Sequence, residues 1–201
     1  MRKLVYFVAA SVDGCIAGPE GQFDFFPMEG DHIAAQCEEL PETLPRHLRT
    51  ALGLPERQAR FDTVLMGWTT YGPALAVGET DPYAPLATFV FSRRQPAREE
   101  GLLRVTAEDP VEVVRALKAK QGRDIWLCGG ATLASALRSE LDELVVKVNP
   151  VLAGDGIRLF AGPFAPESLT LRARRAFESG VTWLTYDVAQ KLEAESEPGR
   201  S

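Results

Sequence analysis

A short apolar run that ends in two adjacent glycines and leads directly into a helical pattern restricts the fold of this chain more than any other feature. The run covers residues 124–128, and Gly129 and Gly130 follow it. Strand–turn–helix units of this kind build α/β folds with parallel strands. Because glycine has no Cβ, the junction also lets backbone N–H groups and a helix start approach an anionic group. A glycine pair alone is equally compatible with a tight turn that binds nothing.

Short apolar runs recur along the chain at the length of buried strands. Residues 3–10 are rich in Val, Tyr and Phe and are typical of a central strand covered on both faces. Further strands are predicted at residues 63–67, 87–92, 102–106, 124–128 and 143–149. The last two runs, residues 169–177 and 182–188, are joined near Ser179-Gly180 and indicate an antiparallel hairpin.

Helical patterns alternate with these strands. One covers residues 31–52 and is interrupted at Pro41 and Pro45, because proline lacks the N–H that a helix interior needs. The others are expected from Thr69 or Thr70 onward, over residues 110–120 and over residues 130–139.

This alternation predicts an α/β fold. We expect a mostly parallel sheet with helices on both faces, to which the final hairpin adds an antiparallel edge. A single domain is expected over residues 1–190, followed by a disordered polar tail over residues 191–201.

Composition excludes several classes of partner. The formal net charge is −6, whereas non-specific binding of nucleic acid requires a basic face. No apolar run is long enough to span a bilayer, so no membrane partner is expected. Residues 1–12 begin Met-Arg-Lys and then turn apolar, but Asp13-Gly14 follows without a small-residue cleavage site. We therefore interpret them as a first strand rather than a signal peptide.

The interpretation of residues 1–12 as a strand predicts a cytoplasmic protein, and cysteine and histidine usage predicts no metal site. Cys15, Cys37 and Cys128 are odd in number and far apart, so they fit neither a disulfide framework nor a paired-cysteine metal site. Only two histidines, His32 and His47, are present, which makes a histidine-rich metal centre improbable.

Unusual residues follow four of the predicted strands. Ligands of such sheets bind beyond the carboxyl ends of the strands, so these four segments are expected to share one crevice. They are Ser11–Gly18, Met66–Tyr71, Phe91–Arg94 and Gly129-Gly130. Taken singly, each is compatible with a turn, a helix cap or a solvated pair of arginines. Taken together, they offer helix starts for a pyrophosphate and guanidinium groups for a further phosphate.

The order and spacing of these segments resemble the dihydrofolate reductase superfamily, most closely its branch that contains the reductase domain of riboflavin biosynthesis. The resemblance extends over residues 3–187. Each motif alone is weak, whereas the ordered set is specific: Asp13-Gly14-x-Ile16-Ala17, Met66-Gly67-x-x-Thr70-Tyr71, Ser92-Arg93, Gly129-Gly130, Leu141-Asp142-Glu143-Leu144, Pro150-Val151-Leu152-x-Gly154-x-Gly156 and Leu159-Phe160.

The resemblance implies a dihydrofolate reductase-like fold with a mixed, mostly parallel eight-stranded sheet. It further implies that NADPH lies across the carboxyl edge of the strands and reduces a pterin- or pyrimidine-like ring. The cofactor-binding residues that it implies are Ala9 and Ile16 at the nicotinamide, Gly67, Thr69, Thr70, Gly129, Gly130, Ala131 and Thr132 at the pyrophosphate, and Ser92 and Arg93 at the 2′-phosphate. Trp68 departs from the family, which often has arginine there, and this weakens the preference for NADPH over NADH.

The proton donor is less clearly marked than the cofactor site. In folate-reducing members a carboxyl group on the first helix protonates the substrate, and such a group works directly or through water. Asp31 is the candidate that we select here, and Asp24 and Glu29 are alternatives. A carboxylate near a helix start can instead serve only to stabilise that helix.

The sequence leaves the substrate open. Dihydrofolate competes with the riboflavin-pathway substrate, for which the activity would be 5-amino-6-(5-phosphoribosylamino)uracil reductase. A nucleotide-binding protein without catalysis is the alternative from another class. A homodimer is also predicted, because large apolar residues lie in the final hairpin and the riboflavin-type relatives commonly associate through this end of the fold. Those residues are Phe177, Trp183, Leu184 and Tyr186.

Overall fold

The computed structural model describes residues 1–188, so the predicted tail over 191–201 lies outside the described residues. The strands are β1 (Leu4–Ser11), β2 (Cys15–Ala17), β3 (Phe61–Gly67), β4 (Ala87–Phe91), β5 (Arg98–Glu100), β6 (Leu103–Thr106), β7 (Asp124–Gly129), β8 (Glu143–Asn149), β9 (Ile157–Arg158), β10 (Leu169–Ala176) and β11 (Thr182–Val188). The α-helices are α1 (Asp31–Glu39), α2 (Arg46–Ala51), α3 (Trp68–Ala76), α4 (Pro110–Lys118) and α5 (Ala131–Ala136). Single 3-10 turns cover Pro41–Thr43 and Arg138–Glu140. Within residues 1–188, no helix is both long and apolar enough to cross a bilayer.

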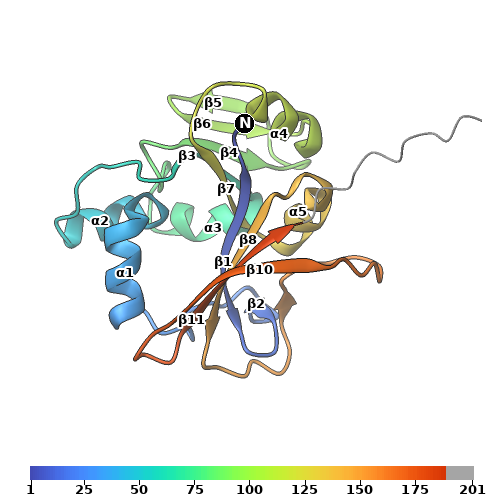
Figure 1. Cartoon of the computed structure of the whole chain (residues 1–201). Coiled ribbons are helices and arrows are strands. Elements are labelled where there is room, and N and C mark those ends of the chain that lie inside the picture. The colour runs from blue at the N-terminus through green and yellow to red at the C-terminus, as the bar shows by residue number, and fades with distance from the viewer. Residues whose placement is uncertain (189–201) are drawn as a thin grey trace, which may run out of the picture.

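Nine strands form one twisted sheet with the order β10-β11-β8-β1-β7-β3-β4-β6-β5 (Figure 1). The pairs that join β8, β1, β7, β3, β4 and β6 are all parallel. At one edge β11 pairs antiparallel with β8 and β10 with β11, which confirms the C-terminal hairpin. The mostly parallel α/β sheet is likewise confirmed.

The other edge carries a strand that the sequence did not indicate. β5 consists of Arg98, Glu99 and Glu100, and it pairs antiparallel with β6. The sheet therefore has nine strands where eight were expected. Charged side chains suit an exposed edge strand, because they discourage pairing with another chain.

Helices cover both faces of the sheet. On one face α4 and α5 pack Val114, Leu133 and Leu137 against β1, β7 and β8. On the other face Tyr71 and Leu75 of α3 pack against Met66 and its neighbours. α1 covers the same face further along, where Ala35 contributes to a small cluster with Phe177, Val181 and Trp183 of the final hairpin.

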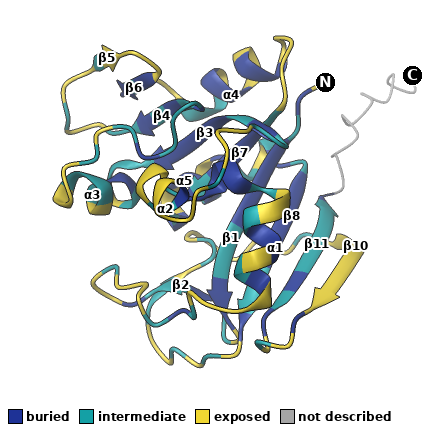
Figure 2. Ribbon diagram, turned by 90° about the vertical axis from the view of Figure 1, so that its left-hand side faces the viewer, coloured by how far each residue is buried: buried dark blue, intermediate teal, exposed yellow. Residues whose placement is uncertain are grey.

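β1 lies at the centre of the molecule. Leu4, Val5 and Tyr6 are fully buried (Figure 2). Val5 pairs with Trp126 of β7 on one side and with Glu143 of β8 on the other. The carboxyl ends of β1, β7, β3 and β4 consequently meet at one edge of the sheet, as the sequence predicted.

Candidate active site

Two helices begin side by side at the carboxyl edge of the sheet. β3 pairs with β7 so that Met66 lies opposite Gly129. α3 starts directly after Gly67 and packs on one face, whereas α5 starts directly after Gly130 and packs on the other. Neighbouring strands whose helices leave to opposite faces form the crevice in which α/β proteins bind nucleotides.

The glycines at this edge leave space beside Thr70 and beside the backbone of Gly130 that a Cβ would occupy. A Cβ on Gly130 would lie 3.3 Å from Oγ1 of Thr70, and a Cβ on Gly67 would lie 3.9 Å from the backbone N of Gly130. Gly129 has a φ of +136°, a conformation that other residues rarely adopt, and its peptide bond to Gly130 is cis. The structure thus brings together Gly67, Thr70, Gly129 and Gly130, which we call the glycine cradle.

Neither helix start in the cradle is capped by a side chain. Gly67 and Gly130 are the N-cap residues, and within residues 1–188 neither helix has a side-chain cap hydrogen bond. By contrast, Asp109 caps α4 and accepts from the backbone N–H of Val111 at 2.7 Å. Uncapped N–H groups in a first turn are ready donors to an anionic group. These first turns contain the remaining predicted residues of the pyrophosphate site, namely Thr69, Thr70, Ala131 and Thr132.

Ser92 and Arg93 follow β4 at the same edge. Phe91 pairs with Gly67, so the next two residues lie beyond the strand end beside the glycine cradle. Oγ of Ser92 accepts hydrogen bonds from the backbone N–H groups of Arg94 and Gln95, at 3.2 and 3.1 Å. Arg93 is exposed and forms no ion pair with residues of the described chain. Arg93 can therefore reach a ligand, whereas the Ser92 hydroxyl already orders its own turn.

Trp68, which departs from the family, packs within the protein. Its ring lies edge-on to Tyr71, with the two ring centres 5.6 Å apart, and it borders the apolar cluster around Met66. This contact accounts for the tryptophan without a ligand.

Ala9 and Ile16, the residues predicted at the nicotinamide, lie in different surroundings. Ala9 is half-buried on β1 and pairs with Lys147 of β8. Ile16 belongs to β2 and packs against the apolar cluster on the face covered by α4 and α5. Of the two, Ala9 points to the face that α1 covers, because side chains alternate along a strand and Phe7 lies on that face.

The loop between β1 and β2 is fixed by Asp13. Its carboxylate accepts from Oγ of Ser11 at 2.6 Å and from the backbone N–H groups of Ala153 and Gly154 at 3.0 and 2.7 Å. These hydrogen bonds, that from Ser11 above all, hold the pKa of Asp13 below its ordinary value. Asp13 is therefore a structural carboxylate that ties the loop after β1 to the loop after β8.

Asp31, the predicted proton donor, is tied to the final hairpin. Its carboxylate accepts from the backbone N–H groups of Glu178 and Ser179, at 2.7 and 3.1 Å. Desolvation favours the neutral acid, but these hydrogen bonds outweigh it and lower the pKa of Asp31. A carboxyl group held in its ionised form has no proton to donate near neutral pH. The structure brings Asp31 to the hairpin and not to the glycine cradle.

A lysine that no sequence motif marks lies next to Ala9. Lys147 projects from β8 toward α1, and its Nζ donates to Oε1 of Gln36 at 2.9 Å. Nζ also lies 4.5 Å from the centre of the Phe7 ring. Burial lowers the pKa of Lys147 to about 8. The signal was present in the sequence as a single charge within the apolar run Leu144-Val145-Val146-Lys147-Val148.

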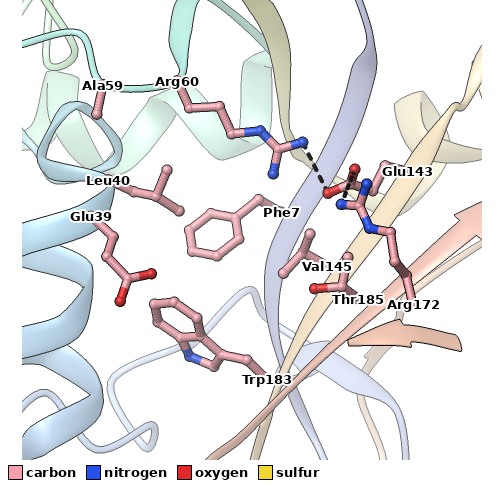
Figure 3. Close-up of a pocket in the computed structure, with 10 residues that line it drawn as sticks. All are labelled: Phe7, Glu39, Leu40, Ala59, Arg60, Glu143, Val145, Arg172, Trp183 and Thr185. Atoms are coloured by element: carbon pink, nitrogen blue, oxygen red, sulfur yellow. Dashed lines mark hydrogen bonds and ion pairs between the residues drawn. The ribbon is translucent and has the colours of Figure 1, made fainter. Parts of the chain in front are cut away.

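A pocket of about 320 Å³ opens on the same face, further toward the amino ends of the strands (Figure 3). Phe7, Val145 and Trp183 form its floor, and Glu39 and Leu40 come from the end of α1. Arg60 and Arg172 both point toward the buried carboxylate of Glu143, at 2.9 and 2.6 Å. Glu143 begins β8, so the pocket lies away from the glycine cradle, with Ala9 and Lys147 between the two.

Comparison with known proteins identifies the family. The sequence model of the RibD C-terminal domain matches residues 2–184. The chain belongs to the RibD C-terminal domain family. The predicted reductase of the riboflavin-pathway type, within the dihydrofolate reductase superfamily, is thereby confirmed.

Two relatives of this RibD-type chain are described as uncharacterized proteins. YwjB of Bacillus subtilis (strain 168) is 28% identical over 185 residues, which are 90% of this chain and 95% of the relative. YyaP of the same organism is 26% identical over 198 residues, which are 92% and 94% of the two chains.

Solved structures share the fold of this RibD-type chain. A putative riboflavin biosynthesis protein from Shewanella sp. PV-4 has a TM-score of 0.68 at 22% identity, with 94% of this chain and 99% of that chain covered. A deaminase/5-amino-6-(5-phosphoribosylamino)uracil reductase from Thermotoga maritima has a TM-score of 0.62 at 14% identity. The comparison covers 94% of this chain but 57% of the Thermotoga protein.

Proposed function

We propose that this protein is an NADPH-dependent reductase that transfers a hydride to a C=N bond in, or attached to, a pterin- or pyrimidine-like heterocycle. The observation that carries the proposal is the glycine cradle, in which two uncapped helix starts meet at the carboxyl edge of the sheet. Arg93 supports the choice of NADPH, because an unpaired guanidinium at this edge suits a 2′-phosphate.

Each part of this edge has a distinct task in the proposal. The bound nicotinamide supplies the hydride. The pyrophosphate of NADPH would be held by Gly67, Thr69, Thr70, Gly129, Gly130, Ala131 and Thr132. Ala9 would adjoin the nicotinamide ring. The backbone donors are held by the sheet itself, so binding requires little reorganisation of the protein.

The arginines near α1 and α2 favour an acceptor whose binding does not depend on a phosphate. Arg46 pairs with Glu79, and Arg60 pairs with Asp124 and Glu143. Arg49 and Arg57 donate to the backbone carbonyls of Ala84 and Glu38. Arg46, Arg57 and Arg60 are thus engaged within the protein, whereas Nε and Nη1 of the buried Arg49 have no hydrogen-bond partner among the described residues. We propose that the reaction takes place in the cytoplasm.

Titration calorimetry with NADPH tests the cradle. Wild-type protein should bind with a dissociation constant of about 1 μM or tighter, roughly −8 kcal/mol. Gly130→Val should abolish binding, because even a Cβ at this position lies 3.3 Å from Thr70. Gly72→Val is the matched control, since a Cβ on Gly72 meets no atom within 4 Å. Equal affinity of wild type and Gly130→Val would reject the cradle.

Oxidation of NADPH separates the reductase from a nucleotide-binding protein without catalysis. The acceptors to compare are dihydrofolate and 5-amino-6-(5-phosphoribosylamino)uracil. Turnover with either acceptor supports a reductase, and tight binding without turnover supports the alternative.

A further inference from the structure

Lys147 occupies a position at which a substrate is expected. It pairs with Ala9 on one side and with Trp183 on the other, and side chains of directly paired residues point to the same face of a sheet. α1 covers that face, because Gln36 of α1 contacts Lys147 and Ala35 packs with Trp183. The pocket of Figure 3 opens on the same face, since Phe7, Val145 and Trp183 line it. Lys147 is half-buried rather than sealed in the core.

The ammonium group of Lys147 is held by a chain of neutral groups. Nζ donates to Oε1 of Gln36, whose Nε2 donates to Oγ1 of Thr43 at 2.8 Å. That hydroxyl in turn donates to the carbonyl of Leu40 at 2.7 Å. The directions of these three hydrogen bonds are fixed, because an ammonium can only donate and a backbone carbonyl can only accept. An ammonium has three donors, and Gln36 takes one of them, which leaves others for a ligand.

No carboxylate neutralises this ammonium among residues 1–188. The groups that face it are Gln36 from α1, the Phe7 ring from β1 and the Cys128 thiol from β7. Burial raises the pKa of Cys128 to about 12 and that of the adjacent Tyr83 well above its ordinary value, so both are neutral near pH 7. Glu39, the last residue of α1, pairs instead with Arg175.

An uncompensated cation on a partly enclosed face is costly to keep, because burial disfavours the charged form. A valine at position 147 would continue the apolar run of β8 without burying a charge. A substrate that accepts a hydrogen bond or a proton from Nζ would remove this cost, and the cation therefore indicates a ligand.

We propose that Lys147 is the proton donor of this reductase and that Gln36 and Thr43 are positioning residues that aim its Nζ at the substrate. The proposal rests on the proposed function above. It replaces Asp31, whose carboxylate is engaged with the backbone of the final hairpin.

The proton balances the reduction of a C=N bond. The acceptor carbon takes the hydride and forms a C–H bond, and the electron pair of the π bond moves to the nitrogen. That nitrogen forms an N–H bond with the proton that Nζ of Lys147 releases. One reduced nicotinamide is oxidised for each C=N bond reduced, and Lys147 regains its proton from solvent.

Steady-state kinetics with whichever of the two acceptors supports turnover provides the first test. Lys147→Met should lower kcat by about 100-fold or more, the scale of general acid catalysis, and leave KM for NADPH within about twofold of wild type. In wild type, kcat/KM should fall as the pH rises above about 8, since the donor must be protonated. Lys147→Met should lack that fall. A kcat within threefold of wild type would overturn the proposal.

A second variant keeps the lysine and changes its neighbour. Gln36→Glu replaces the amide oxygen 2.9 Å from Nζ with a carboxylate, which favours the protonated form. The fall in kcat/KM should move to higher pH by about one unit or more. Ala34→Glu is the charge-matched control, because Ala34 lies on the exposed side of α1, and it should leave the profile unchanged. Equal shifts in both variants, or no shift in either, would contradict the proposed role.

A direct titration needs neither cofactor nor acceptor. Protein labelled with ¹³Cε-lysine should show one resonance that titrates near pH 8 and is missing from Lys147→Met. Because kcat/KM reports groups of the free enzyme, its midpoint should coincide with that of this resonance. Midpoints that differ by more than about half a unit would overturn the proposal. Absence of NADPH oxidation by wild type with both acceptors would overturn the proposed function itself.

Discussion

Arg93 is the residue on which cofactor choice should depend. It is exposed at the end of β4 beside the glycine cradle, and it makes no ion pair within the described chain. Arg93→Ala should weaken NADPH binding by about 1.5–3 kcal/mol, the scale of a charge-assisted hydrogen bond, and leave NADH binding nearly unchanged. Calorimetry with both cofactors measures the difference.

The neighbouring arginine provides the control for charge alone. Arg94→Ala removes the same charge from the same exposed loop and should shift the two affinities much less. If Arg93→Ala weakens NADPH and NADH equally, the guanidinium is not at the 2′-phosphate.

Single residues were predictable from the sequence where backbone geometry decides their role. Gly67, Gly129 and Gly130 could be assigned because a glycine between a strand end and a helix start leaves room for a close backbone approach. Lys147 could not be assigned a role, because that role depends on its hydrogen bond to Gln36, which lies on a different element and 111 positions away. Asp31 was selected for its position at a helix start, and its hydrogen bonds to residues 178 and 179 were not visible in the chain order.

At the scale of elements, α1 is fastened to the final hairpin through its first two residues. Asp31 accepts from two backbone N–H groups of the turn, and Nδ1 of His32 lies 2.9 Å from Oγ of Ser179. This fastening positions the helix that carries Gln36.

Asp31→Asn should therefore lower the free energy of unfolding at pH 7, because it removes the charge that the two N–H groups stabilise. The pKa of Asp31 is lowered in the folded state, so its contribution is present above the ordinary value of 3.8 and is lost as the pH falls further. The difference between variant and wild type should accordingly shrink in acid. Urea unfolding at several pH values measures it, with Glu38→Gln on the exposed side of α1 as control.

Turnover of the same variant distinguishes the two candidate proton donors. If Asp31 supplied the proton, Asp31→Asn would abolish turnover at all pH values. Retained turnover together with reduced stability is the result expected for a structural carboxylate.

Helices and strands with several apolar residues were predictable from the sequence, and those with few or none were not. The interruptions at Pro41 and Pro45 appear as the 3-10 turn between α1 and α2. β5 was missed because Arg98, Glu99 and Glu100 carry no apolar signal, and it exists only because β6 offers it a free edge. β2 and β9 were missed because three and two residues are too few for a periodic pattern.

At the scale of the whole molecule, the predicted homodimer now depends on β10. Phe177 and Trp183 are buried against Ala35 of the same chain, as ordinary core residues would be. β10, however, is exposed along its whole length at the edge of the sheet, and Leu171 is 50% exposed (Figure 2). Long exposed edge strands favour pairing with a second copy.

Light scattering at micromolar concentration tests this prediction. A dimer should have about twice the chain mass of 22.0 kDa, and Leu171→Lys should return it to the monomer mass. Removing the tail from Lys191 onward should change neither result. A wild-type mass near 22.0 kDa would exclude the dimer.

The class of sheet was predictable from the chain, whereas the order of its strands was not. Alternation of strand and helix predicts parallel pairing, but it does not say that β1 inserts between β7 and β8. That insertion places Ala9 beside Lys147 and hence decides which side chains adjoin the proposed substrate site.

The position of β1 between β7 and β8 also affects when its strand pairs can form during synthesis. β1 is translated before both of its neighbours in the sheet, which begin at Asp124 and Glu143. Its apolar residues have no partner strand until β7 has been translated, and contacts between such distant segments form slowly. Truncated products that end before β7 lack both neighbours of their most apolar strand. We therefore expect the apolar residues of β1 to stay exposed during synthesis until β7 and β8 have emerged.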